Sequence, residues 1–599
     1  MTGSATGHGF TTDRGWLIDR LGRPTLLRGV NLGGATKVPV TPPGATHLGV
    51  SFDGWAEVSF VGRPAPLDDL DAHLDRIAGW GMNCLRLLTT WEAIEHAGPG
   101  EYDDAYLDYY AEVVRRAGAR GLWVFVDPHQ DVWSRWTGGD GAPFWCFELA
   151  GLVPERFVAA EAVALDTQDW PENYQRTPVA TMWTLFYGGD TFCPELSGVQ
   201  QELQDRYIGA VAALAERVAH LDNVLGYDPL NEPGNGYIGR SARSMTTGWR
   251  IFEQDGPAPW SPLEYLAAAA GVPVRRDGGE VLNPDGVSVW RDGCPWQRAG
   301  VWDVDDGGRP ALADPVRFAE RDGVRIDSFA DFHAPFIRRF RERLRAVHPD
   351  CLLFIEGSPW DRDMPWDDPD PLVVNARHWY DIVALGTRKV SRGEYRGTTD
   401  VAGLTEVYVD ELRALQRSNE EKSGGLPMLI GEFGVPYEMN GGEAYRTGDF
   451  ALHERLLHAM YGTLDQLAMS GTQWNYTPDN DHAHGDQWNH EDLSVFCAED
   501  GGGRAVAGFS RPYPRHSQGR PVRMQFEPGS ARFELVLDAS SLAAGPTEVV
   551  VPAVHYPDGV QIEVSAGSAH HDAEMCIVLW TLESPAVTTA TARLVLQPA

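Results

Sequence analysis

The chain has 599 residues, of which 43% are hydrophobic, and its formal net charge is −35 at pH 7. This length can bury one barrel-sized core and leave chain for a smaller domain, so two domains are expected. The negative charge repels nucleic acid and anionic surfaces, which makes nucleic acid an unexpected partner. The seven cysteines form no CxxC pair, so the sequence indicates neither a disulfide framework nor a structural zinc site.

No stretch of the sequence approaches the roughly 20 apolar residues of a membrane span. The start, MTGSATGHGFTTDRGW, lacks a charged segment followed by an apolar segment, the pattern of a secretory signal. We therefore expect a soluble, cytoplasmic protein that makes at most transient contact with lipid assemblies.

Short apolar runs alternate with amphipathic stretches over most of the chain, the pattern of repeated strand-helix units. About eight runs read as strands: 25–31, 83–88, 122–127, 224–231, 352–356, 373–380, 428–433 and 472–476. The helix candidates between them are 67–80, 106–120, 200–221, 328–348, 404–417 and 452–469. An eight-fold alternation predicts an α/β fold, a (β/α)₈ TIM barrel with its chemistry at the carboxyl ends of the strands.

The sequence pattern changes near residue 504, where segments begin in which apolar and polar residues alternate, as is typical of β-strands. We predict that residues 1–503 form the catalytic barrel and that residues 504–599 form an all-β sandwich. Two connections inside the barrel are too long for simple loops, at about 138–198 and 234–327, and both leave from the catalytic face. Long loops at that face shape pockets.

Two predicted strands end in a glutamate. Glu232 lies in Asn231-Glu232-Pro233, and Glu432 lies between Gly431 and Gly434. Two carboxylates held across a cleft are what hydrolysis of a glycosidic bond needs, one to protonate the leaving oxygen and one to attack or to activate water. This pair makes a glycosidase the leading interpretation.

Other polar residues at the strand ends suggest opposite environments for the two acids. Arg86 would keep a nearby carboxylate ionised, and Tyr380 could donate a hydrogen bond to it, while the other glutamate stays protonated near neutral pH. Asn231 can hydrogen-bond a sugar 2-hydroxyl. Asp127 and Glu356 also end strands, and either could take one of the roles assigned to the pair.

Three further residues are candidates for substrate binding. His129 and His378 could bind sugar hydroxyls or orient the acids, and a buried structural histidine is the alternative for each. Trp474 could stack under a pyranose ring or simply pack in the core. The run DNDHAHGD from Asp479 superficially resembles a metal cluster, but its spacing fits no specific site, and a polar loop that contacts sugar is favoured. No metal or other cofactor is expected.

The set Arg86, His129, Asn231-Glu232, His378-Trp-Tyr380, Glu432 and Trp474 resembles glycoside hydrolase family five. Longer strings are similar to the endoglycoceramidase-related β-glucosidases of that family that act on glucosylceramide and steryl glucosides: DPHQDVWSRWTGGDGAP from Asp127, TMWTLF from Thr181 and DQWNHEDLS from Asp486. The resemblance implies a retaining enzyme in which the strand-four glutamate, Glu232, is acid/base and the strand-seven glutamate, Glu432, is nucleophile.

The resulting expectation is a retaining β-glucosidase for a glycolipid or other β-glucoside. An endoglycoceramidase that releases an intact oligosaccharide is the nearest alternative, and a catalytically inactive carbohydrate-binding protein is an alternative of another class. The two long insertions carry many large aromatic side chains, which we expect to bind the apolar aglycone, unless they form a core beneath the loops. These side chains are Phe144, Trp145, Phe147, Trp183, Phe186, Trp249, Trp260, Trp290 and Trp296.

Overall fold

The catalytic half of the protein is built on eight parallel strands. The computed structural model describes residues 9–250, 258–359, 363–583 and 590–599. The strands lie in the order β15-β14-β7-β6-β5-β4-β17-β16, and a parallel bridge between Asn375 and Met428 joins the two ends of this sheet. They are β4 (Arg28–Leu32), β5 (Cys84–Thr90), β6 (Trp123–His129), β7 (Val224–Tyr227), β14 (Leu352–Ile355), β15 (Val373–Asn375), β16 (Leu429–Ile430) and β17 (Ser470–Tyr476). The predicted (β/α)₈ barrel is confirmed, with one strand in each predicted run.

Helices cover the outside of this barrel. Each predicted helix is present: α1 (Leu67–Gly79), α3 (Asp104–Gly118), α6 (Val199–Val218), α10 (Ala334–Val347), α12 (Val401–Lys422) and α14 (Ala451–Gln466). In α1 the buried residues are Leu70, Leu74 and Ile77, the spacing of one helix face. Helix α3 begins where the Asp103 carboxylate accepts a hydrogen bond from the Tyr106 amide.

Strand alternation decides which side chains enter the barrel. All seven residues of β5 are buried, as expected for a parallel strand covered on both faces. Cys84 of β5 and Phe125 of β6 belong to the apolar cluster at the amino ends of the strands, where Phe125 stacks on Phe354 with ring centres 4.1 Å apart. Two residues further along the same strands, the period of two places Arg86 and Asp127 above that cluster. The barrel is therefore apolar at its base and charged in its middle.

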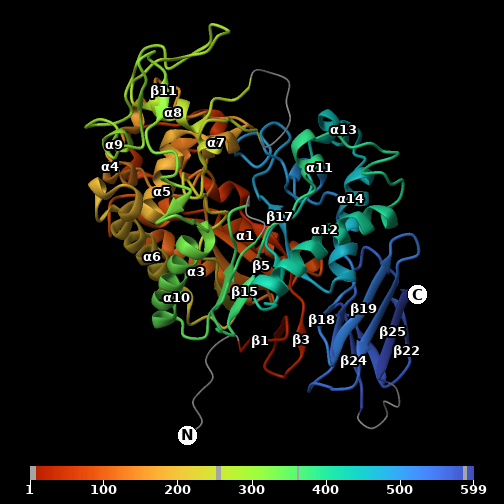
Figure 1. Cartoon of the computed structure of the whole chain (residues 1–599). Helices are drawn as coiled ribbons and strands as arrows, with labels where there is room; N and C mark the ends of the chain where they lie inside the picture. Colours follow the sequence, from red (N-terminus) through yellow and green to blue (C-terminus); the bar gives the residue numbers. More distant parts are fainter. Residues whose placement is uncertain (1–8, 251–257, 360–362, 584–589) are drawn as a thin grey trace.

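The second domain is a sandwich of two antiparallel sheets. One sheet contains β18 (Pro514–His516), β21 (Thr547–Val550), β24 (Ile577–Thr581) and β23 (Ser568–Asp572), and the other contains β19 (Arg520–Glu527), β20 (Arg532–Asp538), β25 (Thr591–Pro598) and β22 (Val560–Val564). The first sheet is extended by β1 (Thr11–Asp13), β2 (Trp16–Ile18) and β3 (Pro24–Thr25). Figure 1 shows these red amino-terminal strands beside the blue β18.

This pairing differs from the predicted boundary, which assigned all of residues 1–503 to the barrel. Thr25 of β3 pairs with His516 of β18, so the amino terminus completes a sheet built from the other end of the chain. The reason is that β1, β2 and β3 are too short to form a sheet alone, and only the tertiary structure brings a partner strand to them.

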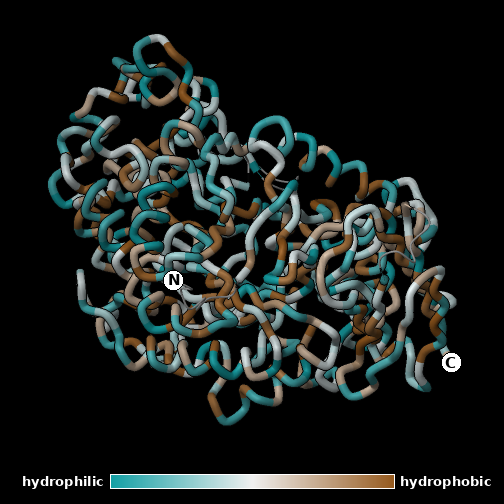
Figure 2. Tube along the Cα trace, turned by 90° about the horizontal axis from the view of Figure 1, so that it is seen from below, coloured by the Kyte–Doolittle hydropathy of each residue, from teal (hydrophilic) through white to brown (hydrophobic). Residues whose placement is uncertain are grey.

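The two long insertions sit together above one side of the barrel, at the upper left of Figure 1. The first contains α4 (Trp145–Leu149) and α5 (Thr177–Phe192). The second contains α7 (Ala242–Met245), α8 (Pro262–Ala269), α9 (Pro295–Arg298) and three two-stranded hairpins: β8 (Val274–Arg275) with β9 (Val281–Leu282), β10 (Trp302–Val304) with β11 (Pro310–Leu312), and β12 (Glu320–Arg321) with β13 (Val324–Arg325). Figure 2 shows hydrophobic segments inside the molecule and hydrophilic ones around its rim. Within the described ranges, no helix has the length and apolarity that crossing a bilayer requires.

Candidate active site

Glu232 and Glu432 come from strands on different sides of the barrel and meet above its charged middle. Glu232 follows β7, and Glu432 lies two residues beyond the end of β16. One carboxylate oxygen of each lies within 4.8 Å of the other. Carboxyl groups about 5–5.5 Å apart are typical of retaining glycosidases, whereas inverting enzymes separate them by roughly 6.5–9.5 Å to admit a water. The spacing is that of a retaining pair.

Glu432 is surrounded by hydrogen-bond donors. Arg86 Nη1 donates to Glu432 Oε1 at 2.6 Å, and the Tyr380 hydroxyl donates to Oε2 at 2.8 Å. Burial and the nearby Glu432 raise the pKa of Tyr380 well above its ordinary value, so the phenol keeps its proton. A cation on one oxygen and a phenol on the other suit an ionised carboxylate.

The glycines beside Glu432 allow this geometry. A Cβ on Gly431 would lie 2.5 Å from the carbonyl oxygen of Ala376, and one on Gly434 would lie 2.2 Å from that of Trp474. Only glycine permits the backbone around Glu432 to approach its neighbours this closely.

Arg86 is the centre of a buried acidic ring. Its side chain is 0% exposed, and its Nη2 lies 3.1 Å from Asp127, 3.2 Å from Asp228 and 3.3 Å from Glu356. Burial alone would lower the pKa of Arg86, but these carboxylates and Glu432 raise it above its ordinary value. Arg86 therefore keeps its positive charge, and it lies directly below the two candidate acids.

Glu232 has the opposite environment. Burial, with a smaller contribution from Asp131, raises its pKa to about 7. Its carboxylate bonds to Nδ1 of His378 at 2.8 Å. A carboxyl group with this pKa is partly protonated at neutral pH, as a general acid must be.

The backbone of Glu232 is strained, and its neighbours hold it in place. Its φ is 35°, in the left-handed region that side chains rarely adopt. The Gln130 side-chain amide donates to the carbonyl oxygens of Asn231 and Glu232, both at 2.9 Å, and the Tyr174 hydroxyl donates to the latter at 3.2 Å. A strained backbone that several neighbouring contacts hold in place is common at functional sites.

His378 lies between the two candidate acids. Its Nδ1 is 2.8 Å from Glu232 and 3.4 Å from Glu432, and its Nε2 is 3.2 Å from Glu356. Burial lowers the pKa of His378 to about 3, so the ring is neutral. Burial and the neighbouring Asp228 raise the pKa of Glu356 well above its ordinary value.

The remaining predicted residues line a cavity of about 170 Å³ above the acids. His129 lies under Trp474 with ring centres 5.1 Å apart, and both are almost fully buried. Burial alone would lower the pKa of His129, but Asp127 and Asp131 raise it to about 10. Asn231 accepts a hydrogen bond from Arg86 at 2.8 Å and also lines the cavity. All eight predicted site residues therefore converge in one place.

Sequence reasoning missed four charged residues on the wall of this cavity, namely Lys37, Asp131, Arg388 and Glu491. Lys37 Nζ lies 2.6 Å from Asp131 and 3.6 Å from the ring centre of Trp488. Glu491 accepts a hydrogen bond from the Trp170 indole at 2.9 Å and also faces the cavity. Asp131 was visible in the quoted string after Asp127, but nothing in the sequence links it to Lys37, 94 positions away.

The aromatic side chains of the insertions are mostly core, and the prediction that they bind an aglycone was wrong for most of them. Seven are between 0% and 4% exposed: Phe144, Trp145, Phe147, Trp183, Phe186, Trp290 and Trp296. Most of them pack against neighbouring aromatic rings, as Phe147 does against Phe157 and Trp296 against Tyr237, because an insertion of this length must bury its own apolar side chains in order to stay folded. Trp249 and Trp260 are half-buried.

An apolar rim does surround the cavity, but other residues form it. Ile382 is 54% exposed and lines the cavity together with Leu385. Both belong to α11 (Ile382–Thr387), and Trp170 and Pro171 face them. This rim is the apolar surface next to the acids.

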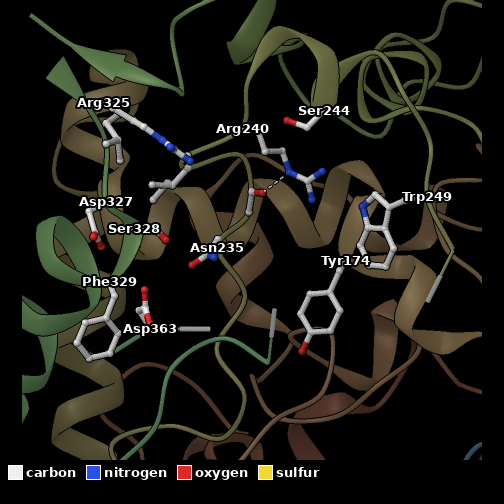
Figure 3. Close-up of a pocket in the computed structure, with 14 residues that line it drawn as sticks. Tyr174, Asn235, Arg240, Ser244, Trp249, Arg325, Asp327, Ser328, Phe329 and Asp363 are labelled. Atoms are coloured by element: carbon white, nitrogen blue, oxygen red, sulfur yellow. Dashed lines mark hydrogen bonds between the residues drawn. The ribbon is translucent and has the colours of Figure 1, made fainter. Parts of the chain in front are cut away.

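A larger cavity of about 820 Å³ adjoins the first, and Tyr174 lines both. Figure 3 shows Tyr174 beside Trp249, with Asn235 and Arg240 among the other side chains that line the cavity. Asn235 follows Glu232 by three residues. This cavity therefore lies on the Glu232 side of the site.

Three groups in the described part of the chain bring metal-ligand atoms within 4.8 Å of one another: Glu232, His378 and Glu432; His129, Asp131 and Asp140; and His482, Cys497 and Glu499. A neighbouring charged group contacts one member of each set. Lys37 contacts Asp131, Arg86 contacts Glu432, and Asp500 contacts His482 at 2.9 Å.

Comparison with known sequences places this site in a family. Residues 49–254 match the model for cellulase (glycosyl hydrolase family 5), and residues 511–591 match that for the glycoside hydrolase family 5 C-terminal domain. The resemblance expected from the sequence is thereby confirmed.

Relatives and solved structures agree along the whole chain. A glucosylceramidase of Rhizopus delemar is 31% identical over 92% of this chain and 91% of its own length. Endoglycoceramidase I of Rhodococcus hoagii is 30% identical over 92% of this chain and 81% of its own. A crystal structure of Cryptococcus neoformans sterylglucosidase 1 superposes with a TM-score of 0.90, at 30% identity, over 99% of this chain and 97% of that one. With two carboxylates at retaining distance above a (β/α)₈ barrel, this chain belongs to glycoside hydrolase family 5.

Proposed function

We propose that this enzyme is a retaining β-glucosidase in which Glu432 is the nucleophile and Glu232 is the acid/base. One observation carries the assignment of roles. Two carboxyl groups whose oxygens lie within 4.8 Å have opposite environments: Arg86 and Tyr380 donate to Glu432, whereas burial raises the pKa of Glu232 to about 7. Residues in such pairs divide into an ionised nucleophile and a protonated acid.

The first chemical step forms one bond and breaks another. A Glu432 oxygen bonds to the anomeric carbon while the bond from that carbon to the leaving oxygen breaks, and the Glu232 proton moves to the leaving oxygen. In the second step water attacks the anomeric carbon, Glu232 accepts its proton, and the Glu432 carboxylate leaves. Two inversions at one carbon return the β configuration. No step uses a metal or an organic cofactor.

The remaining site residues bind and orient the sugar. Asn231 and His129 lie beside the acids, and Trp474 presents an aromatic face in the same cavity. Lys37 and Asp131 add charged hydrogen-bonding groups to the wall. Polar and charged side chains of this kind recognise sugar hydroxyls, and here they line the small cavity above the acids.

The aglycone in this proposal is lipid-like. Trp170, Pro171, Ile382 and Leu385 line the same cavity as the two acids, and Ile382 is exposed, so a group leaving from a bound sugar could contact this apolar surface. The relatives named glucosylceramidase and sterylglucosidase support glucosides of ceramide or sterol as substrates.

An endoglycoceramidase is the second candidate, and the relative of that name in Rhodococcus hoagii favours it. An endo-acting enzyme needs space for further sugars beyond the first. The cavity above the acids, about 170 Å³ and walled by Lys37, Asp131 and Glu491, favours release of a single sugar. The adjoining cavity of about 820 Å³ lies on the Glu232 side, where the leaving group would be.

One experiment separates these candidates. The purified enzyme is incubated with glucosylceramide, lactosylceramide, a steryl glucoside and cellotetraose, and the products are resolved by thin-layer chromatography. A glucosidase releases glucose from the first and third substrates and leaves lactosylceramide intact. Release of lactose would establish the endo activity instead. A location in the cytoplasm and the absence of a nucleic-acid partner stay predictions from the sequence.

A further inference from the structure

The base of the barrel, opposite the catalytic face, contains an unbalanced cluster of buried charges. Arg28 is the first residue of β4, Asp465 lies near the end of α14, and Arg511 lies in the connection that leads into β18. All three are buried, with exposures of 3%, 2% and 4%. The cluster therefore joins the barrel, its last helix and the sandwich.

The two arginines share one carboxylate. Arg28 Nη2 lies 3.0 Å from Asp465 Oδ1, and Arg511 Nη2 lies 2.8 Å from Asp465 Oδ2. In the described ranges, no other acid lies within 4.0 Å of either guanidinium. Two cations and one anion leave a net charge of +1 in a buried place, which is costly unless it is compensated.

Several donors of the two guanidinium groups also lack acceptors. Nε and Nη1 of Arg28 and Nε of Arg511 are buried and have no hydrogen-bond acceptor among the described residues. Buried arginine nitrogens are almost always bonded, so each of these requires an explanation. An acceptor that carries negative charge would satisfy the donors and the charge together.

A small cavity lies where these groups meet. Its volume is about 10 Å³, close to the minimum that holds one water-sized particle. Arg28 and Arg511 line it together with Trp80, Met82, Phe509 and Tyr513. The aromatic and thioether walls suit a weakly hydrated monatomic ion. A halide is slightly larger than a water molecule, so these side chains must move apart slightly to admit it.

We propose that this cavity is a binding site for one small monovalent anion, such as chloride or bromide, which couples the barrel to the sandwich. The anion accepts hydrogen bonds from Arg28 and Arg511 and brings the net charge of the cluster to zero. The site is independent of catalysis, because it lies at the amino ends of the strands, where residues of (β/α)₈ barrels contribute to stability.

Crystallography of the full chain in sodium bromide gives a direct test, with data collected at the bromine absorption edge. The expected result is an anomalous difference peak in the cavity, in contact with Arg28 and Arg511. Density in the cavity that lacks anomalous signal in bromide-containing crystals would belong to a water molecule and would overturn the proposal.

Solution measurements test the charge argument. The Tm of the native enzyme should rise by at least about 1 °C and level off as sodium chloride replaces sodium gluconate at constant ionic strength, because an ion that binds only the folded state stabilises it by mass action. In Arg28→Met, which keeps the aliphatic stem and leaves Arg511 paired with Asp465, this rise should be lost. Arg309→Met is the matched control, since that arginine side chain is 80% exposed.

Asp465→Asn provides the opposite change. It raises the charge of the cluster to +2, so the dependence of Tm on chloride should become steeper than in the native enzyme. A linear, non-saturating response to chloride that is the same in native, Arg28→Met and Arg309→Met proteins would reflect general salt effects and contradict a specific site.

Discussion

Nδ1 of His378 lies 2.8 Å from the carboxylate of Glu232, and the same nitrogen lies 3.4 Å from Glu432. A neutral imidazole therefore stands between an acid whose pKa is raised to about 7 and a carboxylate held by Arg86. The two acids are linked through this ring, yet each has its own set of partners. Because the partners differ, substitutions of the two acids should have different consequences.

Glu432→Gln should abolish turnover and leave the fold intact, because an amide can neither attack the anomeric carbon nor stabilise positive charge there. The expected loss in kcat exceeds the ~10²–10⁴ of a single acid/base group. Aryl β-glucoside hydrolysis and circular dichroism measure the two properties. Glu356→Gln is the matched control: Glu356 also contacts Arg86, but burial raises its pKa and it does not attack the sugar, so an amide should cost less than about tenfold. Equal losses in the two variants would contradict the assignment of the nucleophile.

Glu232→Ala should retain the first step with substrates whose leaving group needs no proton, such as dinitrophenyl β-glucoside. The glycosyl-enzyme then accumulates, because no base activates water. Added azide should restore turnover and yield a β-glycosyl azide, identified by NMR. An α-glycosyl azide, or no rescue, would show that Glu232 has another role.

The pH profile follows from the raised pKa of Glu232. The group acts in its protonated form, so kcat/KM for a glucoside with a poor leaving group should be high below pH 7 and fall as pH rises through about 7. The dinitrophenyl substrate needs no proton, so its kcat/KM should lack this decline. A decline shared by both substrates would assign the titration to a different group.

Retention of configuration follows from the separation of the acids. Carboxylate oxygens within 4.8 Å of each other are too close to hold both the anomeric carbon and a water molecule between them, so Glu432 must attack directly. Proton NMR at early times should show β-glucose before mutarotation produces the α anomer. Initial α-glucose would require inversion and exclude the two-step mechanism.

The apolar rim predicts how the enzyme selects its aglycone. Ile382→Ser should lower kcat/KM for octyl and steryl β-glucosides by roughly fivefold and leave methyl β-glucoside almost unchanged, since an aglycone that covers the exposed half of this side chain gains about 1 kcal/mol. Val554→Ser, an exposed apolar position in the sandwich, is the control. A uniform effect on all three substrates, measured in the same detergent, would mean that the rim does not contact the aglycone.

The sequence by itself determined the barrel, because each strand and helix carries its own period of apolar residues. It also determined the pair of glutamates and their partners Arg86, His129, Asn231, His378, Tyr380 and Trp474. Carboxyl ends of parallel strands meet at one face, so residues that end strands must come together there. These inferences needed only local patterns and the geometry of one fold.

The tertiary structure alone decided the rest. The pairing of β3 with β18 and the ion pair between Lys37 and Asp131 join positions far apart in the sequence, and no local pattern encodes such contacts. The aromatic residues of the insertions show the same limit. In the sequence, a tryptophan in a long loop looks the same whether it contacts substrate or packs in the core. Only the packing of the whole fold placed Trp183 and Trp296 inside and left Ile382 exposed at the rim. Burial is a property of the whole fold, since it depends on which surfaces cover a side chain after the chain has folded.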